Sequence, residues 1–81
     1  MWYDYIGPEQ CGWRLIRKGT AFLGVYNYIN HKKELLFSEW LDYAESFIEN
    51  EQCALIMRPG DSEYKLINTQ GVIIGVKTFE F

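Results

Sequence analysis

The segment Ser38–Asn50, SEWLDYAESFIEN, has the most regular spacing of apolar residues in the chain and predicts an α-helix. At the angular step of a helix, its apolar side chains fall on one continuous arc, as in a helix that packs against a core. These side chains are Trp40, Leu41, Tyr43, Ala44, Phe47 and Ile48. Ser38 precedes them and suits the N-cap position, because its hydroxyl can accept a hydrogen bond from an amide of the first turn.

The opposite arc of this expected helix is acidic and carries Glu39, Asp42, Glu45 and Glu49. Like charges three and four residues apart weaken a helix by roughly 0.2–0.5 kcal/mol per pair, and the segment contains no Lys or Arg to offset them. One interpretation is a solvated face that keeps a small protein soluble. The other is a partner-binding face that docks on a basic surface, where concentrated charge speeds association and selects the partner.

Short apolar runs separated by turn residues predict strands on both sides of the helix. They are Trp2–Ile6, Trp13–Lys18, Ala21–Ile29, Cys53–Arg58, Glu63–Asn68 and Val72–Phe79. Gly7-Pro8 and Pro59-Gly60 mark turns, since proline presets φ and glycine supplies positive φ. Val72–Phe79 is apolar on both faces and is therefore expected at the centre of a sheet. Glu34–Phe37 fits either a short strand or the first turn of the helix, and we expect the strand because a longer helix would place Lys33 on the apolar arc.

These elements predict an α+β fold in the order ββ(β)-α-βββ, with one helix packed across an antiparallel sheet of five to six strands. A chain of 81 residues has room for one domain, residues 1–81. One helix cannot cover both faces of such a sheet. The sheet therefore either curls into a partial barrel around the helix or leaves its second face to a partner.

The second face of that sheet is expected to be aromatic. In Ala21–Ile29 aliphatic and aromatic side chains alternate, and the aromatic ones should face away from the helix. They are Phe22, Tyr26 and Tyr28. Gly24 interrupts the row, which indicates a bulge or a second backbone passing close by. The row can form barrel core, a dimer interface, or a platform on which the bases of a single-stranded nucleic acid stack. Basic residues of the preceding strand lie nearby in sequence, namely Arg14, Arg17 and Lys18.

The net charge of −3 is unevenly distributed along the chain. Residues 1–33 carry five basic and two acidic side chains, whereas residues 34–63 carry eight acidic and one basic. The acidic charge is thus concentrated on and around the expected helix, which favours a partner of opposite charge. No apolar run is long enough for a membrane span, and the N-terminus lacks the basic start of a secretory signal. We therefore expect a cytoplasmic protein that makes no contact with a membrane.

No pattern of catalytic or metal-binding residues is present in the sequence, so we expect neither an enzyme nor a bound metal or cofactor. His31 is the only histidine, and in its polar turn it is interpreted as a solvated residue. Cys11 and Cys53 are too scattered to form a zinc site with it, and they are expected to be reduced thiols. The phosphate-binding motif GxGxxG and the P-loop motif are both absent.

The sequence therefore predicts a non-enzymatic protein-interaction module. The acidic helix face would make it an inhibitor or adaptor that docks on a basic, nucleic-acid-binding surface of a larger protein. Such a role suits an accessory protein of a phage or mobile element, and a homodimer is a further expectation. The alternative is an RNA or single-stranded DNA binder that uses the aromatic strand face with the nearby Arg and Lys side chains.

Overall fold

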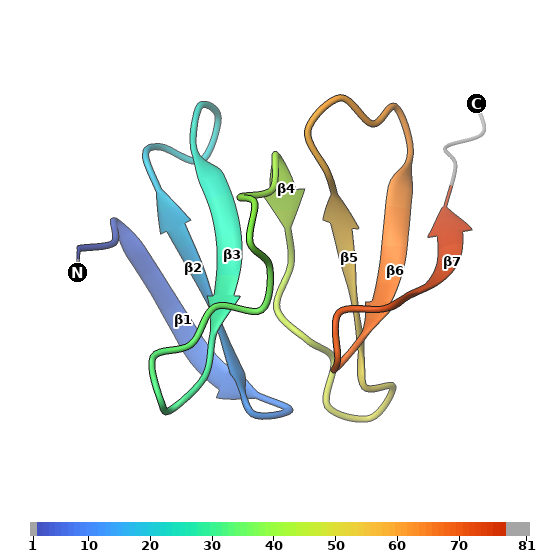
Figure 1. Cartoon of the computed structure of the whole chain (residues 1–81), viewed down its shortest axis with the longest axis horizontal. Helices are drawn as coiled ribbons and strands as arrows, with labels where there is room; N and C mark the ends of the chain where they lie inside the picture. Colours follow the sequence, from blue (N-terminus) through green and yellow to red (C-terminus); the bar gives the residue numbers. More distant parts are fainter. Residues whose placement is uncertain (1, 78–81) are drawn as a thin grey trace.

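The computed structural model describes residues 2–77, and this part of the chain contains seven β-strands and no helix. The first three strands form an N-terminal sheet in the order β1-β2-β3, and the other four form a C-terminal sheet in the order β4-β5-β6-β7 (Figure 1). All neighbouring strands are antiparallel. The strands are β1 Tyr5–Gln10, β2 Trp13–Lys18, β3 Val25–Ile29, β4 Tyr43–Ala44, β5 Cys53–Met57, β6 Tyr64–Asn68 and β7 Ile73–Lys77.

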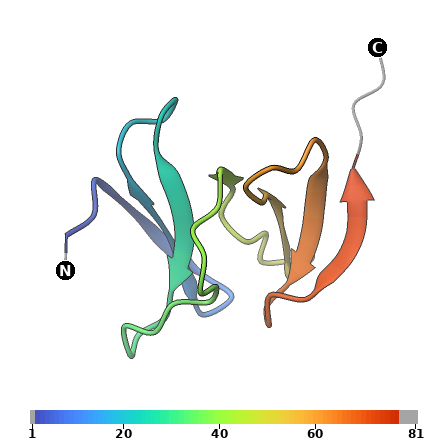
Figure 2. The ribbon, with the colours of Figure 1, turned by 45° about the horizontal axis from the view of Figure 1, so that its top comes forward.

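The α+β prediction is wrong, because Ser38–Asn50 forms no helix. Within this segment only Tyr43–Ala44 makes a regular strand, β4, while Leu41 and Ile48 each pair with another part of the chain through a single bridge. The segment runs between the two sheets as an extended connection (Figures 1 and 2).

The segment is extended because both sheets form hydrogen bonds with its backbone. Tyr26 of β3 and Leu41 exchange two backbone hydrogen bonds of 2.8 Å each. On the other side, the amides of Asp42 and Glu45 donate to carbonyls of β5 at 3.0 Å each. A helix would satisfy its own backbone and leave these strand edges without partners, at about 1–3 kcal/mol for each buried group left unpaired. Pairing between distant segments therefore outweighs the helical periodicity.

The apolar spacing of the segment nevertheless marks part of the core. Leu41, Ala44 and Phe47 are all buried, at intervals of three residues. An irregular extended chain and a helix can share this interval, which is why the pattern is ambiguous. The rest of the expected arc is different, because Trp40 is only half-buried and Ile48 is 49% exposed.

Tyr28 lies in the core and has no exposed surface. Its ring packs against Phe47 with the ring centroids 4.9 Å apart, and its hydroxyl donates to the backbone carbonyl of Glu45 at 2.5 Å. Burial raises the pKa of Tyr28 well above its ordinary value, so the hydroxyl stays protonated and remains a donor. The same core draws on both sheets and includes Leu15, Tyr26, Leu41, Ala44, Ala54, Ile56 and Ile67.

Asn27 is fully buried, and its side chain replaces the backbone hydrogen bonds that a continuous neighbouring strand would make. Its Nδ2 donates to the carbonyl of Phe37 at 3.0 Å, and its Oδ1 accepts from the amide of Phe37 at 3.3 Å and from that of Tyr28 at 2.8 Å. The side-chain amide thus pairs with Phe37 as a backbone peptide would. Before and after this point the same segment pairs with the backbone of β3 directly, so Asn27 bridges the place where residues 38–40 leave the sheet.

Glu34–Phe37 resembles the expected short strand more than a helical turn. Leu35 forms a single bridge with Ile29, and the amide of Leu36 donates to the carbonyl of Tyr28 at 3.0 Å. The stretch therefore lies beside β3 and begins the extended connection.

The N-terminal hairpin differs from the prediction in its first strand. β2 has the predicted bounds, but β1 begins at Tyr5 and runs through Gly7-Pro8, which was expected to end it. Proline is tolerated there because β1 lies at the edge of the sheet, where a missing amide need not remove a ladder hydrogen bond. The chain turns instead at Cys11-Gly12, whose φ angles of 55° and 85° match the twist of hairpin strands.

β3 is shorter than the predicted strand Ala21–Ile29, because Ala21–Leu23 forms a turn. Of the two interpretations of Gly24, a bulge or a second backbone close by, the structure supports the close backbone. A Cβ atom at this position would lie 2.7 Å from the carbonyl oxygen of Lys18, so a larger residue would push the hairpin apart.

In the C-terminal sheet, β5 and β6 lie within the predicted strands Cys53–Arg58 and Glu63–Asn68. β7 lies within Val72–Phe79, of which Thr78 and Phe79 fall outside the described residues. The expected central position of this strand is wrong, because β7 pairs with β6 on one side and is the last strand of its sheet. Its apolar character is therefore not explained by burial.

Asn27→Ala is expected to lower the free energy of unfolding by about 2–4 kcal/mol in denaturant titration, because it leaves the amide and the carbonyl of Phe37 without partners. Asn50→Ala changes an exposed turn residue and should stay within about 0.5 kcal/mol of the wild type. A loss below about 1 kcal/mol for Asn27→Ala would show that this side chain does not hold the connection on β3.

Candidate binding surfaces

The four acidic residues predicted to share a helix face do not share one, because the helix does not exist. Glu39, Asp42, Glu45 and Glu49 are all exposed, but they are spaced along the extended connection. Two of them accept hydrogen bonds within the fold. A carboxylate oxygen of Glu45 accepts from the Tyr43 hydroxyl at 2.7 Å, and one of Glu49 accepts from the Cys11 amide at 3.1 Å. The sequence pattern does not reveal that the segment carrying these acids pairs with strands of both sheets.

One of these acids borders an apolar hollow on the C-terminal sheet. The hollow has a volume of about 260 Å³, and its apolar lining includes Ile48, Leu55 and Leu66. Glu45 and Glu51 provide carboxylates and Lys77 an ammonium group in the same lining. Leu55 and Leu66 are opposite each other on β5 and β6, so this hollow lies on one face of the sheet.

β7 exposes aliphatic side chains along its length. Val72, Ile73, Ile74 and Val76 are 55%, 39%, 58% and 54% exposed, and we call them the β7 patch. The opposite end of the described molecule is different, because the edge strand β1 carries Pro8 and Glu9, residues that discourage pairing with another strand. β7 has no proline and a single charged residue, Lys77. The patch was missed because an apolar strand was assumed to be a buried one.

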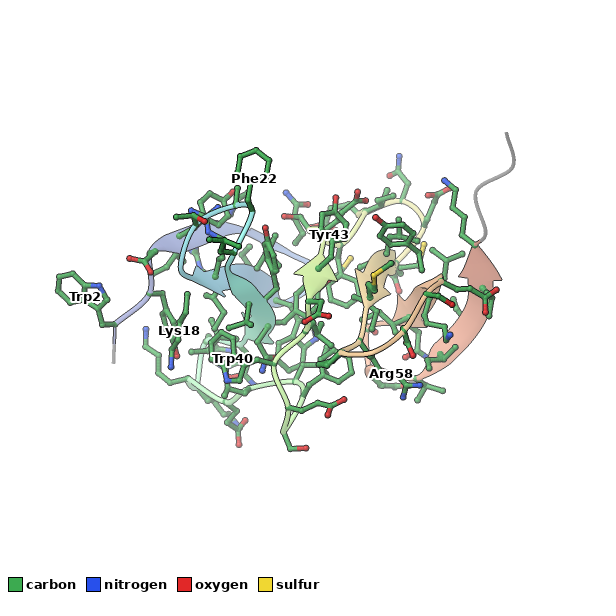
Figure 3. All side chains as sticks on the ribbon, turned by 90° about the horizontal axis from the view of Figure 1, so that it is seen from above. Trp2, Lys18, Phe22, Trp40, Tyr43 and Arg58 are labelled. Atoms are coloured by element: carbon green, nitrogen blue, oxygen red, sulfur yellow. The ribbon has the colours of Figure 1, made fainter. Side chains whose placement is uncertain are left out.

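The aromatic row predicted on the second strand face is divided between the core and the surface. Tyr26 and Tyr28 are 7% and 0% exposed, whereas Phe22 is 97% exposed at the tip of the β2–β3 turn and points away from the molecule (Figure 3). Of the three roles considered for this row (core, dimer interface and stacking platform), a place in the core fits Tyr26 and Tyr28. The cross-strand pairing of Leu15 with Tyr28 explains this, because opposite residues share a face and Leu15 is also buried.

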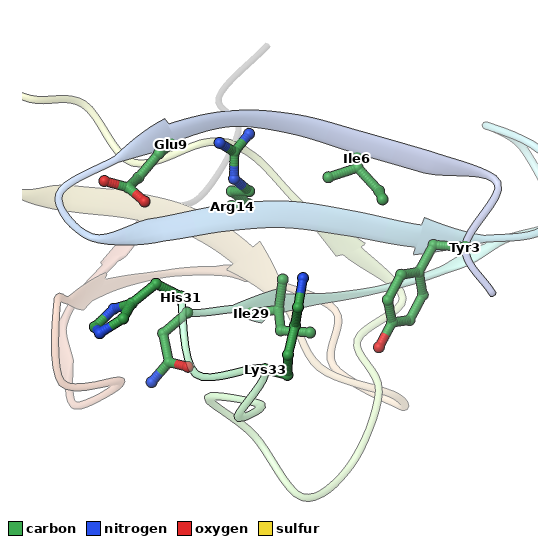
Figure 4. A pocket seen from close by; sticks show the side chains of 8 residues that line it. Tyr3, Ile6, Glu9, Arg14, Ile29, His31 and Lys33 are labelled. Atoms are coloured by element: carbon green, nitrogen blue, oxygen red, sulfur yellow. The ribbon is translucent and has the colours of Figure 1, made fainter. Parts of the chain in front are cut away.

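A groove of about 710 Å³ lies on the other face of the N-terminal sheet (Figure 4). Ile6 of β1 and Ile29 of β3 give it an apolar floor, and Tyr3 lines it from the segment before β1. Its ionisable lining consists of Glu9, Arg14, His31 and Lys33. His31, interpreted from sequence as a solvated turn residue, thus lies at the edge of a cavity.

A cation and two aromatic rings stand next to this groove. Lys18 and Trp40 lie side by side (Figure 3), with the Nζ of Lys18 4.7 Å from the centre of the Trp40 ring. The rings of Trp40 and Tyr3 have centroids 6.1 Å apart. Trp40 was expected in the helix core. It reaches this face because residues 38–40 leave the sheet at Asn27.

The ionisable groups of the described residues include two thiols. Cys11 and Cys53 are free thiols. Burial and the nearby Glu49 carboxylate raise the pKa of Cys11, which is the opposite of what a nucleophilic thiolate requires. Within residues 2–77, no group of three or more His, Cys, Asp or Glu side chains could hold a metal ion.

The comparisons with known proteins give no relative: no family model, curated protein or solved structure matches the chain. None of the described residues forms a helix of the length and hydrophobicity needed to cross a membrane.

The Tyr43 hydroxyl bonded to Glu45 predicts an alkaline transition. The hydrogen bond to this carboxylate and the burial of the phenol raise the pKa of Tyr43 from 10.0 to about 12. A raised pKa contributes stability that is complete below about pH 10 and is lost as the pH rises through about 12. Glu45→Gln should lower the pKa of Tyr43 towards its ordinary value and remove this loss.

The measurement is the tyrosinate absorbance of each protein minus that of the same protein carrying Tyr43→Phe, with denaturant titrations across the same pH range. Glu39→Gln removes an exposed carboxylate elsewhere and is the control. Titration of Tyr43 near pH 10 in the wild type would contradict the contact.

Proposed function

We propose that the protein is a non-enzymatic interaction module that binds another protein through its C-terminal sheet. The β7 patch is the observation that carries this proposal. Three exposed aliphatic side chains of the edge strand β7 form this patch together with Val72 just before it, and the strand has neither a proline nor an internal charge to protect it. Exposed apolar side chains gathered on one unprotected edge strand typically mark a site of interaction with another chain.

The carboxylates near the hollow indicate the chemistry of the partner. Glu45 and Glu51 border apolar side chains and outnumber the single cation of the lining, Lys77, an arrangement that suits an Arg or Lys whose aliphatic stem packs on Leu55 and Leu66. The partner therefore presents an apolar segment flanked by basic residues. A larger protein with a basic, nucleic-acid-binding surface meets this requirement, and occupying that surface would inhibit it. A cytoplasmic setting agrees with the two free thiols.

A second copy of the chain is the other candidate for this face. Two β7 strands can pair in antiparallel fashion around Gly75, and their Lys77 residues would then lie at opposite ends of the pair. Like charges would thus be kept apart. Sedimentation velocity over a range of protein concentrations separates this arrangement, which gives a dimer, from a monomer that awaits a different partner.

Ile74→Asp is expected to abolish partner binding with the fold retained, because Ile74 is 58% exposed. The matched control is Ile6→Asp, which places the same charge at a 56% exposed isoleucine on the N-terminal sheet. The measurement is quantitative affinity capture from a nuclease-treated host lysate, followed by dissociation constants for the recovered protein. Equal recovery with wild type and Ile74→Asp would reject the C-terminal sheet as the binding surface.

The charge of the partner is tested with Glu45→Gln combined with Glu51→Gln. This variant should bind the recovered protein more slowly and with a weaker dependence on salt, because it removes two of the carboxylates that attract it. Glu39→Gln combined with Glu63→Gln changes the net charge equally at sites outside the hollow. If both double variants behave alike, the partner does not contact the hollow.

A further inference from the structure

The groove on the N-terminal sheet is formed by side chains that the strand register places on one face. Arg14 of β2 is opposite Glu9 of β1 and Ile29 of β3, and residues directly opposite in antiparallel strands share a face. Lys18 points to the same face because it lies four residues from Arg14 along the strand. The face therefore presents cations at two points along β2, with an apolar floor between them.

The charge of the groove is positive, in contrast to the net charge of the chain. Two cations, Arg14 and Lys33, line it together with a single acid, Glu9, and with His31. Arg14 is oriented by a hydrogen bond from its Nη1 to the carbonyl of Gly7 at 3.1 Å, which uses one of the five donors of a guanidinium. The others suit the oxygens of a phosphate, since Arg matches that geometry with two parallel hydrogen bonds.

Tyr3 forms an aromatic wall at the other end of the groove. The Trp40 ring lies beside Tyr3, and the ammonium group of Lys18 lies over the Trp40 ring. The contact with Lys18 therefore helps to hold Trp40, which in turn supports Tyr3. A ring supported in this way, beside the apolar floor of Ile6 and Ile29, can stack against a flat ligand.

We propose that this groove binds single-stranded nucleic acid, with a base against Tyr3 and the floor and a phosphate at Arg14 and Lys33. A volume of about 710 Å³ lies within the roughly 300–1,000 Å³ of small-ligand sites and accommodates a nucleotide unit. Aromatic stacking beside a cationic track is the combination that single-strand binders use. The site lies on a different sheet from the protein-binding surface proposed above, so each can be tested without the other.

The probe is a fluorescently labelled oligothymidylate or oligouridylate of about ten nucleotides, within the range that small single-strand binding folds cover. Anisotropy titrations of the full chain, repeated at several salt concentrations, should show saturable binding that weakens as salt rises. The DNA and RNA probes identify which strand is preferred. Thymidine and uridine monophosphates serve as competitors.

Arg14→Ala combined with Lys33→Ala should weaken binding by about tenfold or more. It should also reduce the slope of log affinity against log salt by roughly 0.7, since these two side chains hold one phosphate and each neutralised phosphate of a single strand contributes about that much. The matched control is Lys32→Ala combined with Lys77→Ala, which removes the same charge outside the groove. This control should bind within about twofold of the wild type.

Tyr3→Ala should weaken binding by about tenfold through lost stacking. Tyr5→Ala removes the same side chain from the opposite face, where its ring packs under Arg17 instead, and should have little effect. Thermal unfolding of each variant shows whether a loss of binding reflects loss of fold. Should Tyr3→Ala unfold the protein, Tyr3→Phe, which keeps the ring, must bind as the wild type does.

Three outcomes would overturn the proposal. The first is no binding of either oligonucleotide at low salt. The second is an equal loss for the groove variant and its charge-matched control, or equally tight binding of polyglutamate, because either would mean general attraction of polyanions. The third is a nucleoside monophosphate that binds as tightly as the oligonucleotides, which would assign the groove to free nucleotides.

Discussion

The arrangement of both sheets depends on the way the buried edge of β3 is paired. Asn27 has no exposed surface and supplies an amide where the neighbouring segment leaves the sheet. Without that amide, Phe37 would lose both of its partners on β3. Because the segment is held at Phe37 and again at Leu41, it reaches β5 in an extended conformation and joins the two sheets. The Asn27 side chain thus allows one connecting segment to form hydrogen bonds with both sheets.

The same departure from the sheet creates surface features of the N-terminal half. Residues 38–40 leave the sheet at Asn27, and Trp40 consequently stands beside Tyr3 and Lys18. Beyond Leu41 the connection lies against β5 and places Glu45 beside an apolar hollow. The chain therefore separates a basic, aromatic groove on one sheet from an apolar edge with nearby acids on the other. Our two proposals rest on these two chemically different surfaces.

Several local features could be predicted from the residues themselves. The bounds of β2 and the positions of β5 and β6 were predictable because apolar runs lie between strong turn residues such as Pro59-Gly60. The close backbone at Gly24 was predictable because a glycine inside a strand pattern has few other uses. The groove was not predictable, because Tyr3, Arg14 and Lys33 come together only through strand register and a loop.

By itself, the sequence determined some of the turns, such as Pro59-Gly60, which residues are apolar enough to form a core, and how the charge is divided between its halves. Only the tertiary structure decided that Ser38–Asn50 is extended, that Tyr26 and Tyr28 point inward, and that β7 lies at an edge. The physical reason is that a periodic pattern records which side chains prefer burial. It does not record which distant backbone groups need a hydrogen-bonding partner, and here the unpaired edges of β3 and β5 required one.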